Sequence, residues 1–227
     1  RRNLNGVIKI IWDYELDLPL EKLFNELIDF WKIEFPNLDF SKKEVLNDLI
    51  EFLVQRIVSH LEEISLSKEL IKALYSSDEF SQKRILNIVD LKNRVKSIVN
   101  FKEKETFFEI QKVITRVSKL ANSSNLSTEV LSIGDYVNTK LFEKDCELKV
   151  FEFIKELEKL YSKGSCDYLK LLNLFEININ TIEDLFDNEK GVLVMTEDMK
   201  VRNNRLNLLS LIRNYSLKIA DFTLLNS

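Results

Sequence analysis

Residues 197–219 read EDMKVRNNRLNLLSLIRNYSLKI, and this run predicts one long helix near the end of the chain. Its apolar side chains recur at the spacing of one buried helical face, namely Val201, Leu208, Ile212, Tyr215 and Ile219. Thr196 is expected to cap the helix, because a threonine hydroxyl accepts hydrogen bonds from a first turn. Glu197 and Asp198 would then lie in that turn, where the helix dipole favours negative charge.

The rest of the chain also predicts helices, separated by short polar breaks. Four glycines and two prolines are few for 227 residues, whereas sheets with tight turns and phosphate-binding loops use glycine heavily. Residues 192–195 (VLVM) are the one strand candidate, and they are too short to form a sheet. Periodicity and capping residues predict helices at about residues 3–16, 19–35, 41–61, 67–74, 79–99, 107–121, 136–144, 146–162, 166–175 and 180–187. We therefore expect an all-α protein.

The polar run FKEKET at residues 101–106 is the best internal boundary. It predicts two packed helical bundles, one over residues 1–105 and one over residues 106–227. The clearest loop, residues 122–128 (NSSNLST), lies inside the second of these.

The composition, with 45% hydrophobic and 31% charged residues, is typical of a soluble globular protein. No stretch approaches the ~18 consecutive apolar residues of a membrane span. The net charge of -4 argues against a general nucleic-acid binder, yet it leaves room for a local basic face. Cys146 and Cys166 leave two interpretations open, a disulfide or two free thiols in a reducing cytosol, and we favour the thiols.

His60 is the one histidine, and it is expected to be a partly exposed residue near the end of the third helix. A zinc site needs three or four ligands at close spacing, and none is visible. A serine or cysteine nucleophile would need a histidine base, and no plausible pair is visible either. The sequence therefore favours a binding or assembly role over catalysis.

Basic residues gather in two places. Residues 83–104 carry seven lysines and arginines against two acidic residues, and Lys92 and Lys96 share one helical face there. That face either contacts phosphates or is simply solvated, and the sequence alone favours the solvated face. In the last predicted helix, four residues either contact RNA or tie helices together through carboxylates such as Asp187 or Asp221: Arg202, Asn204, Arg205 and Arg213. Tyr136, Tyr161 and Tyr168 are candidates for stacking on bases.

Motifs spread along the whole chain carry a family resemblance. They are RRNLNGVIKII at 1–11, DEF at 78–80 followed by Lys83 and Arg84, TRVSKL at 115–120, LFEKDCE at 141–147, IEDLFD at 182–187, VLVMTED at 192–198, VRNNRL at 201–206 and ADFTLL at 220–225. In this order they resemble the beta subunit of bacterial heterotetrameric glycyl-tRNA synthetase. Its final segments read approximately V-D-x-F-F-D, V-M-V-M-x-x-D, R-x-N-R-L and A-D-x-S-x-L. Thr115 departs from a family Lys, Lys119 departs from a family Asn, and residues 188–191 look like a short insertion.

The resemblance implies a helical body segment at residues 1–105, which would follow an HD-like module, and a DALR-like anticodon-binding domain at residues 106–227. The implied function is tRNA binding that supports the ATP-dependent attachment of glycine to its tRNA at the active site of the alpha subunit. No catalytic residue and no cofactor are expected in this chain, because the alpha subunit would use ATP and magnesium. The residues expected to bind tRNA are Arg202, Arg205, Asn204, Arg213, Arg116, Lys119, Lys92 and Lys96.

The resemblance also implies the partners and the setting. Glycine tRNA, the alpha subunit and the upstream part of the beta subunit would be the partners, in the cytoplasm and without a membrane. Because the chain opens on Arg1 and Arg2 without an initiator methionine, we expect it to begin inside a longer protein.

Three other functions compete with this one. The first is a helical scaffold for subunit assembly that does not bind RNA, with an exposed apolar face around Phe30, Trp31 and Phe35. The second is the related anticodon domain of an arginyl-type synthetase, which shares the helical plan. The third is an enzyme in its own right, which the poverty of histidine, cysteine and glycine motifs disfavours.

Overall fold

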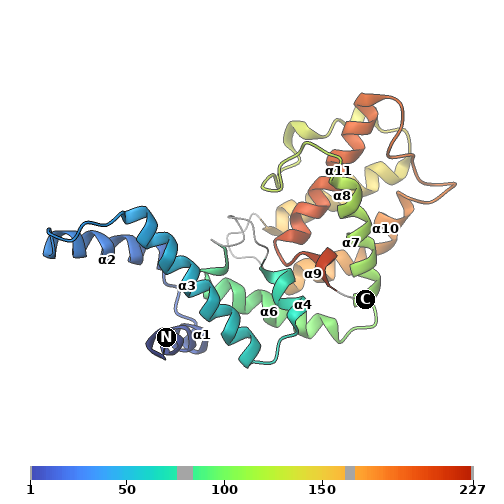
Figure 1. The fold of residues 1–227 in the computed structure, drawn as a ribbon. Coiled ribbons are helices and arrows are strands. Elements are labelled where there is room, and N and C mark those ends of the chain that lie inside the picture. Colours follow the sequence, from blue (N-terminus) through green and yellow to red (C-terminus); the bar gives the residue numbers. More distant parts are fainter. Residues whose placement is uncertain (1, 76–83, 162–166, 226–227) are drawn as a thin grey trace. The chain divides into compact units, whose positions relative to one another are not determined.

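The structure is a computed structural model that describes residues 2–75, 84–161 and 167–225. Every regular element among those residues is a helix, so the predicted all-α fold is confirmed (Figure 1). The chain divides into two compact units, Arg1–Val95 and Lys96–Ser227, and the division falls inside α6 (Ile88–Lys102). The predicted boundary between residues 1–105 and 106–227 falls just after that helix. The division into these two domains stays a prediction. Within the described part of the chain, no helix is long and apolar enough to cross a membrane.

The first unit is organised by α3 (Lys42–Glu63), which packs against both α1 (Arg2–Tyr14) and α2 (Leu20–Glu34). The predicted caps are confirmed, because the hydroxyl of Ser41 accepts the N–H of Glu44 and begins α3. The hydroxyl of Ser67 begins α4 (Lys68–Leu74) in the same way. The core of this unit is apolar and includes Ile8, Ile11, Leu53, Ile57 and Leu61.

The second unit is organised by α11 (Met199–Leu217), which packs against α7 (Phe107–Ala121) and α8 (Asp145–Tyr161). The apolar face predicted for α11 is confirmed at Val201, Leu208, Ile212 and Tyr215, which are buried, whereas the buried Ile219 lies just beyond the end of the helix. Burial goes further than that face, because every residue at positions 208–216 is buried. The unit is completed by α9 (Tyr168–Ile177), α10 (Ile179–Asp184) and the 3-10 turns η1 (Gly134–Tyr136), η2 (Thr139–Leu141) and η3 (Phe222–Leu224).

The predicted start of α11 was wrong by two residues. Asp198 is the N-cap instead of Thr196, and its Oδ1 accepts the N–H groups of Lys200 at 2.8 Å and Val201 at 3.2 Å. The hydrogen bonds from Val201 and Lys200 lower the pKa of the Asp198 carboxyl. A carboxylate caps a helix at least as well as a hydroxyl, and its negative charge also interacts favourably with the positive end of the helix dipole.

Other predicted elements also differ from the structure. The helix expected at 136–144 is replaced by η1 and η2, because the side chain of Asn138 accepts the N–H of Lys140 and starts a separate turn. Residues 192–195 form no strand, and the first part of the helix expected at 79–99 lies outside the described residues. Cys146 is a buried free thiol whose pKa is raised by burial, whereas Cys166 lies outside the described residues.

His60 was predicted to be partly exposed, and this prediction was wrong. It lies in the last turn of α3 as expected, but it is only 8% exposed and its ring packs edge-on against Trp12, with 5.0 Å between ring centroids. Among the described residues, neither ring nitrogen has a hydrogen-bond partner. Burial therefore lowers the pKa of His60, and the nearby carboxylate of Glu63 opposes this only in part.

This burial makes the first unit sensitive to acid. The folded pKa of His60 is below its unfolded value of about 6.5, so the unfolded chain binds the proton more readily. The stabilising contribution is present above about pH 6.5 and is lost as the pH falls below it, by at most about 1.4 kcal/mol per pH unit. We expect His60→Leu to lose less stability than the wild type between pH 7.5 and pH 5.5, measured as thermal unfolding midpoints. Identical losses in both proteins would contradict this role for His60.

Candidate nucleic-acid interface

Arg205 was predicted to bind RNA, and its side chain lies in the core of the second unit. It is 2% exposed, and its Nε donates to Oε1 of Glu147 at 2.9 Å while its Nη2 donates to Oε2 of Glu143 at 2.6 Å. Its Nη1 donates to the carbonyl of Leu193 at 3.1 Å. Burial opposes the charge of Arg205, but the hydrogen bonds of the two glutamates outweigh it and raise its pKa. The guanidinium therefore joins α8 and the 192–195 segment to α11.

Glu147 is the buried one of the two glutamates that pair with Arg205. Its side chain is fully buried, and its Oε2 also accepts the backbone N–H groups of Glu143 at 2.7 Å and Lys144 at 3.1 Å. One carboxylate thus accepts hydrogen bonds both from the backbone just before α8 and from the guanidinium of Arg205. A buried charge of this kind persists because it is paired and hydrogen-bonded at the same time.

Arg213 is buried without a carboxylate. Its guanidinium donates to the carbonyls of Ala121 and Leu126, each at 3.1 Å, and to the side-chain oxygen of Asn214. Asn214 in turn donates to the carbonyls of Ser127 at 2.8 Å and Val130 at 2.7 Å. Desolvation lowers the pKa of Arg213. The pair holds the loop after α7 against α11.

The other two candidates on α11 also bind backbone atoms. Asn204 exchanges two hydrogen bonds with the backbone of Asn138, at 2.7 and 3.1 Å. Arg202 is half-buried, and its Nε donates to the carbonyl of Thr196 at 2.6 Å.

These contacts agree with the alternative interpretation, in which the arginines tie elements together. The carboxylates that were expected to pair with them, Asp187 and Asp221, were wrongly chosen. Asp187 accepts the N–H groups of Glu189 and Lys190, and Asp221 caps η3. RNA contact by Arg202, Asn204, Arg205 and Arg213 stays a prediction.

The two lysines predicted on α6 do not share one environment. Lys92 is 12% exposed, and its ammonium contacts the carbonyl of Trp12 at 2.6 Å and the carboxylate of Glu15 at 2.9 Å. Lys96, one turn later, is exposed. Of the tyrosines proposed for stacking, Tyr168 is buried and Tyr161 packs edge-on against Tyr215, whereas Tyr136 is 46% exposed.

The structure does bring Arg116 and Lys119 together, on the exposed side of α7. With Lys112 they line a surface hollow of about 510 Å³, called here the α7 hollow, whose other walls are Phe108, Gln111, Thr115, Thr223 and Leu225. Among the described residues, its lining holds three cationic side chains and no carboxylate. Lys112 was missed by the sequence analysis, although the basic residues at 112, 116 and 119 have the spacing of one helical face.

The floor of the α7 hollow is fixed by the end of the chain. Gln111 donates to the carbonyl of Leu225 at 2.6 Å, and Phe107 packs on Phe222 with 6.4 Å between ring centroids. Thr115, which stands where the family has a lysine, is half-buried and directs its hydroxyl to the carbonyl of Phe222 at 3.5 Å. That position therefore contributes shape and no charge.

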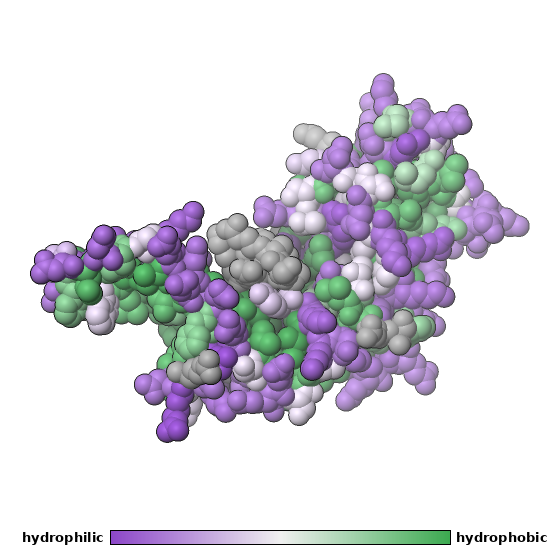
Figure 2. Space-filling view, viewed as in Figure 1, coloured by the Kyte–Doolittle hydropathy of each residue, from purple (hydrophilic) through white to green (hydrophobic). Residues whose placement is uncertain are grey.

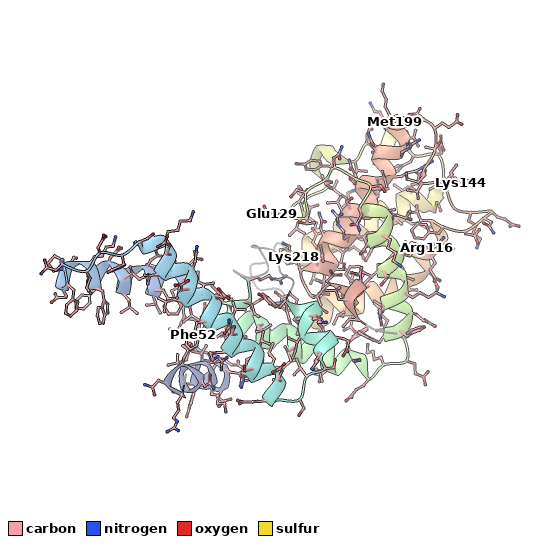
Figure 3. The ribbon with its side chains drawn as sticks, in the orientation of Figure 1. Phe52, Arg116, Glu129, Lys144, Met199 and Lys218 are labelled. Atoms are coloured by element: carbon pink, nitrogen blue, oxygen red, sulfur yellow. The ribbon has the colours of Figure 1, made fainter. Side chains whose placement is uncertain are left out.

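A second hollow, of about 370 Å³, adjoins the first through Arg116. We call it the Phe186 hollow, because the guanidinium carbon of Arg116 lies 4.3 Å from the centre of the Phe186 ring. Leu193 and Met195, which are 72% and 45% exposed, line its other side. Figure 3 shows Arg116 on α7. A cation held over a ring beside exposed apolar side chains offers flat surfaces to a ligand.

The geometry points to binding chemistry. Within the described ranges, no group of three or more histidine, cysteine, aspartate or glutamate side chains is placed to hold a metal ion. The arrangement that remains is a cationic hollow beside one that combines an aromatic ring and apolar side chains with the polar side chains of Asp187 and Asn188. It suits a ligand that carries phosphates and flat rings.

Comparison with known proteins agrees with the resemblance seen in the sequence. Residues 1–76 match the sequence family described as "Glycyl-tRNA synthetase beta subunit". The chain is 31% identical over 226 residues to the glycine–tRNA ligase beta subunit of Picosynechococcus sp.. This alignment covers 98% of the chain and 31% of that protein. The chain is 30% identical over 227 residues to that of Trichodesmium erythraeum, with coverage of 98% and 31%. It is 27% identical over 229 residues to that of Yersinia pestis, with coverage of 99% and 30%.

The chain is therefore a homologue of an aminoacyl-tRNA synthetase subunit. The subunit in question is the beta subunit of glycyl-tRNA synthetase, and the chain spans about 31% of the length of the curated relatives quoted first. The predicted family is thus confirmed.

The buried ion pair of Arg205 gives a stability prediction. Arg205→Ala is expected to lower the free energy of unfolding by about 3–5 kcal/mol, because it leaves the buried Glu147 carboxylate without its partner. Arg116→Ala, at an exposed site, is expected to change it by no more than about 0.5 kcal/mol. Urea denaturation of the two variants measures both values. Equally small changes would show that the Arg205 pair does not support the core.

Gly191, which lines the Phe186 hollow, gives a second prediction. A Cβ there would lie 2.4 Å from the carbonyl oxygen and 2.6 Å from the nitrogen of Asp187, so Gly191→Ala must displace this loop and should lower the unfolding midpoint. Gly6→Ala is the control, because nothing lies within 4 Å of its Cβ in the middle of α1. It should stabilise the protein by about 0.5–1 kcal/mol. A stable Gly191→Ala variant would mean that the loop has room to move.

Proposed function

We propose that this chain is the tRNA-binding, anticodon-reading region of a glycine–tRNA ligase beta subunit. It supports the ATP-dependent attachment of glycine to its tRNA at the active site of the alpha subunit, in the cytoplasm. Residues 106–227 form a DALR-like anticodon-binding helical bundle, and residues 1–105 form a second bundle that belongs to the body of the subunit. The chain itself contributes no catalytic group, since the alpha subunit uses ATP and magnesium. Its partners are glycine tRNA, the alpha subunit and the upstream part of the beta subunit.

The observation that carries this proposal is the charge of the α7 hollow. The whole chain has a net charge of -4, yet this hollow is lined by Lys112, Arg116 and Lys119 without a carboxylate. Phosphates are attracted by the local field and not by the net charge, so the face suits an RNA backbone. The sequence similarity to a glycine–tRNA ligase beta subunit, which extends over 98% of the chain, supports the same function.

The adjoining Phe186 hollow supplies what an unpaired base needs. Proteins read single-stranded RNA by stacking splayed bases on aromatic rings and guanidinium planes. Arg116 over Phe186, with the exposed Leu193 and Met195 beside them, offers such surfaces one step away from the cationic hollow. A backbone that follows α7 would thus place a base next to Arg116.

The proposal gives the predicted tRNA-binding residues different roles. Arg116 and Lys119, with Lys112, contact the RNA directly. Arg205, Asn204 and Arg213 act indirectly, because they hold the segments that surround α11. Lys92 is tied to the first helix by its contacts with Trp12 and Glu15, so it also acts indirectly.

The direct test measures binding of this chain to glycine tRNA at two salt concentrations. Exchanging Lys112, Arg116 and Lys119 together for alanine is expected to weaken binding and to reduce the slope of log affinity against log salt by about one for each lost phosphate contact. The matched control is Lys149→Ala, which removes an exposed lysine on α8 and should leave the slope unchanged.

A copy of the tRNA with an exchanged anticodon completes the test. Binding that is lost with this copy supports anticodon reading by the second unit. Equal binding to both RNAs would limit the chain to backbone affinity. A folded chain without affinity for either RNA would overturn the proposed function.

A further inference from the structure

One exposed apolar surface of the first unit lies on α2 and on the residues that directly follow it. The predicted apolar face is there, because Phe30, Trp31 and Phe35 are 56%, 51% and 47% exposed. Trp31 stacks on Phe35 with 4.9 Å between ring centroids. Figure 2 shows the apolar side chains gathered along the hairpin of α2 and α3. Exposed apolar surface on this scale marks a site of interaction.

Between α2 and α3 this surface is hollowed. A groove of about 330 Å³, called here the α2–α3 hollow, is lined only by apolar side chains: Leu27, Ile28, Trp31, Phe40, Val45 and Leu49. Two helices with an apolar groove between them are the usual receptor for a third amphipathic helix, which inserts side chains one turn apart. The hollow has the shape for such a helix.

The surroundings of the hollow are acidic. Residues 20–51 contain four lysines against eight acidic residues, namely Glu21, Glu26, Asp29, Glu34, Asp39, Glu44, Asp48 and Glu51. Two of the lysines pair with acidic residues, Lys42 with Asp29 at 2.6 Å and Lys22 with Glu26 at 3.8 Å. Six carboxylates then remain against two lysines, one of which, Lys32, lies 5.3 Å from the centre of the Phe40 ring. Glu34 follows Trp31 by one turn and Asp48 precedes Leu49, and both are exposed. The apolar groove is thus flanked by uncompensated negative charge.

This negative charge favours some ligands of the hollow over others. An RNA backbone would be repelled by it. A second copy of this chain, packed about a two-fold axis, would bring the same acidic flanks together, and juxtaposed like charges disfavour that contact. A helix with lysines or arginines beside its apolar face would gain attraction at both flanks.

We propose that the α2–α3 hollow binds an amphipathic helix of a different protein chain, with apolar side chains in the groove and basic side chains against the acidic flanks. The inference does not depend on RNA binding, because the α7 hollow lies in the other unit. It gives the chain a protein-docking surface separate from its proposed RNA surface.

The test uses two synthetic helical peptides with the same leucines at positions i, i+3, i+4 and i+7. One carries flanking lysines and the other carries flanking glutamates. Trp31 lines the hollow and is half exposed, so the fluorescence of the 227-residue chain reports binding. The lysine peptide is expected to shift the emission to shorter wavelength with an affinity that falls as salt rises, and the glutamate peptide to bind at least about tenfold more weakly.

A matched pair of variants locates the site. Leu27→Gln, at a position 54% exposed in the hollow, is expected to weaken the lysine peptide by about tenfold. Ile10→Gln, at a position 51% exposed on α1, should leave the affinity unchanged. Circular dichroism confirms that both variants remain folded.

Four results would overturn the proposal. They are no binding of the lysine peptide to the folded chain, equal affinity for the two peptides, equal effects of Leu27→Gln and Ile10→Gln, and a dimer in sedimentation that Leu27→Gln dissolves. The last result would assign the hollow to a second copy. Glycine tRNA binding measured on Leu27→Gln keeps the two proposals separate, because it should equal that of the wild type whether or not the peptide binds.

Discussion

The second unit depends on polar side chains of α11 that are buried and fully engaged with backbone groups of other segments. Arg205 joins Glu147 and the carbonyl of Leu193, and Arg213 joins the carbonyls of Ala121 and Leu126. The carbonyls of Leu126 and Leu193 lie in irregular segments outside the helices, and Arg213 and Arg205 supply their hydrogen-bond donors. A central helix made only of leucine could not supply those donors. The polar residues of α11 therefore hold the loops in place while its leucines fill the core.

This arrangement determines which cations remain for a ligand. The guanidinium groups of Arg205 and Arg213 on α11 are used inside the protein, whereas that of Arg116 on α7 lies at its surface. Arg116 illustrates the contrast, because it lies over Phe186 at the junction of two hollows and Lys112 and Lys119 line the first of them. Burial thus separates the arginines that hold the fold together from the cations that remain at the surface. The loop that ends at Val194, held by Arg205, forms one wall of the Phe186 hollow, so the buried network also shapes the surface site.

A net charge of -4 conceals two surfaces of opposite character. The α7 hollow has three cations and no carboxylate among its lining residues, and residues 20–51 have twice as many acidic as basic residues around an apolar groove. Each surface attracts what the other repels, because the local field and not the total charge acts at contact distance. The two surfaces therefore suit ligands of opposite charge, and each lies within a different unit of the chain.

Local sequence patterns were enough to predict the helical class, most helix positions, the caps at Ser41 and Ser67, most of the apolar face of α11 and the family. These follow from local periodicity, from side chains that bond to residues three positions away, and from motif order. The role of each charged side chain could be read only from the folded protein. Arg205 and its partner Glu147 are 58 residues apart, and the ring of His60 is covered by Trp12 from another helix. Whether an arginine faces an RNA or a buried carboxylate depends on what packs against it, and spacing along one helix carries no information about that partner.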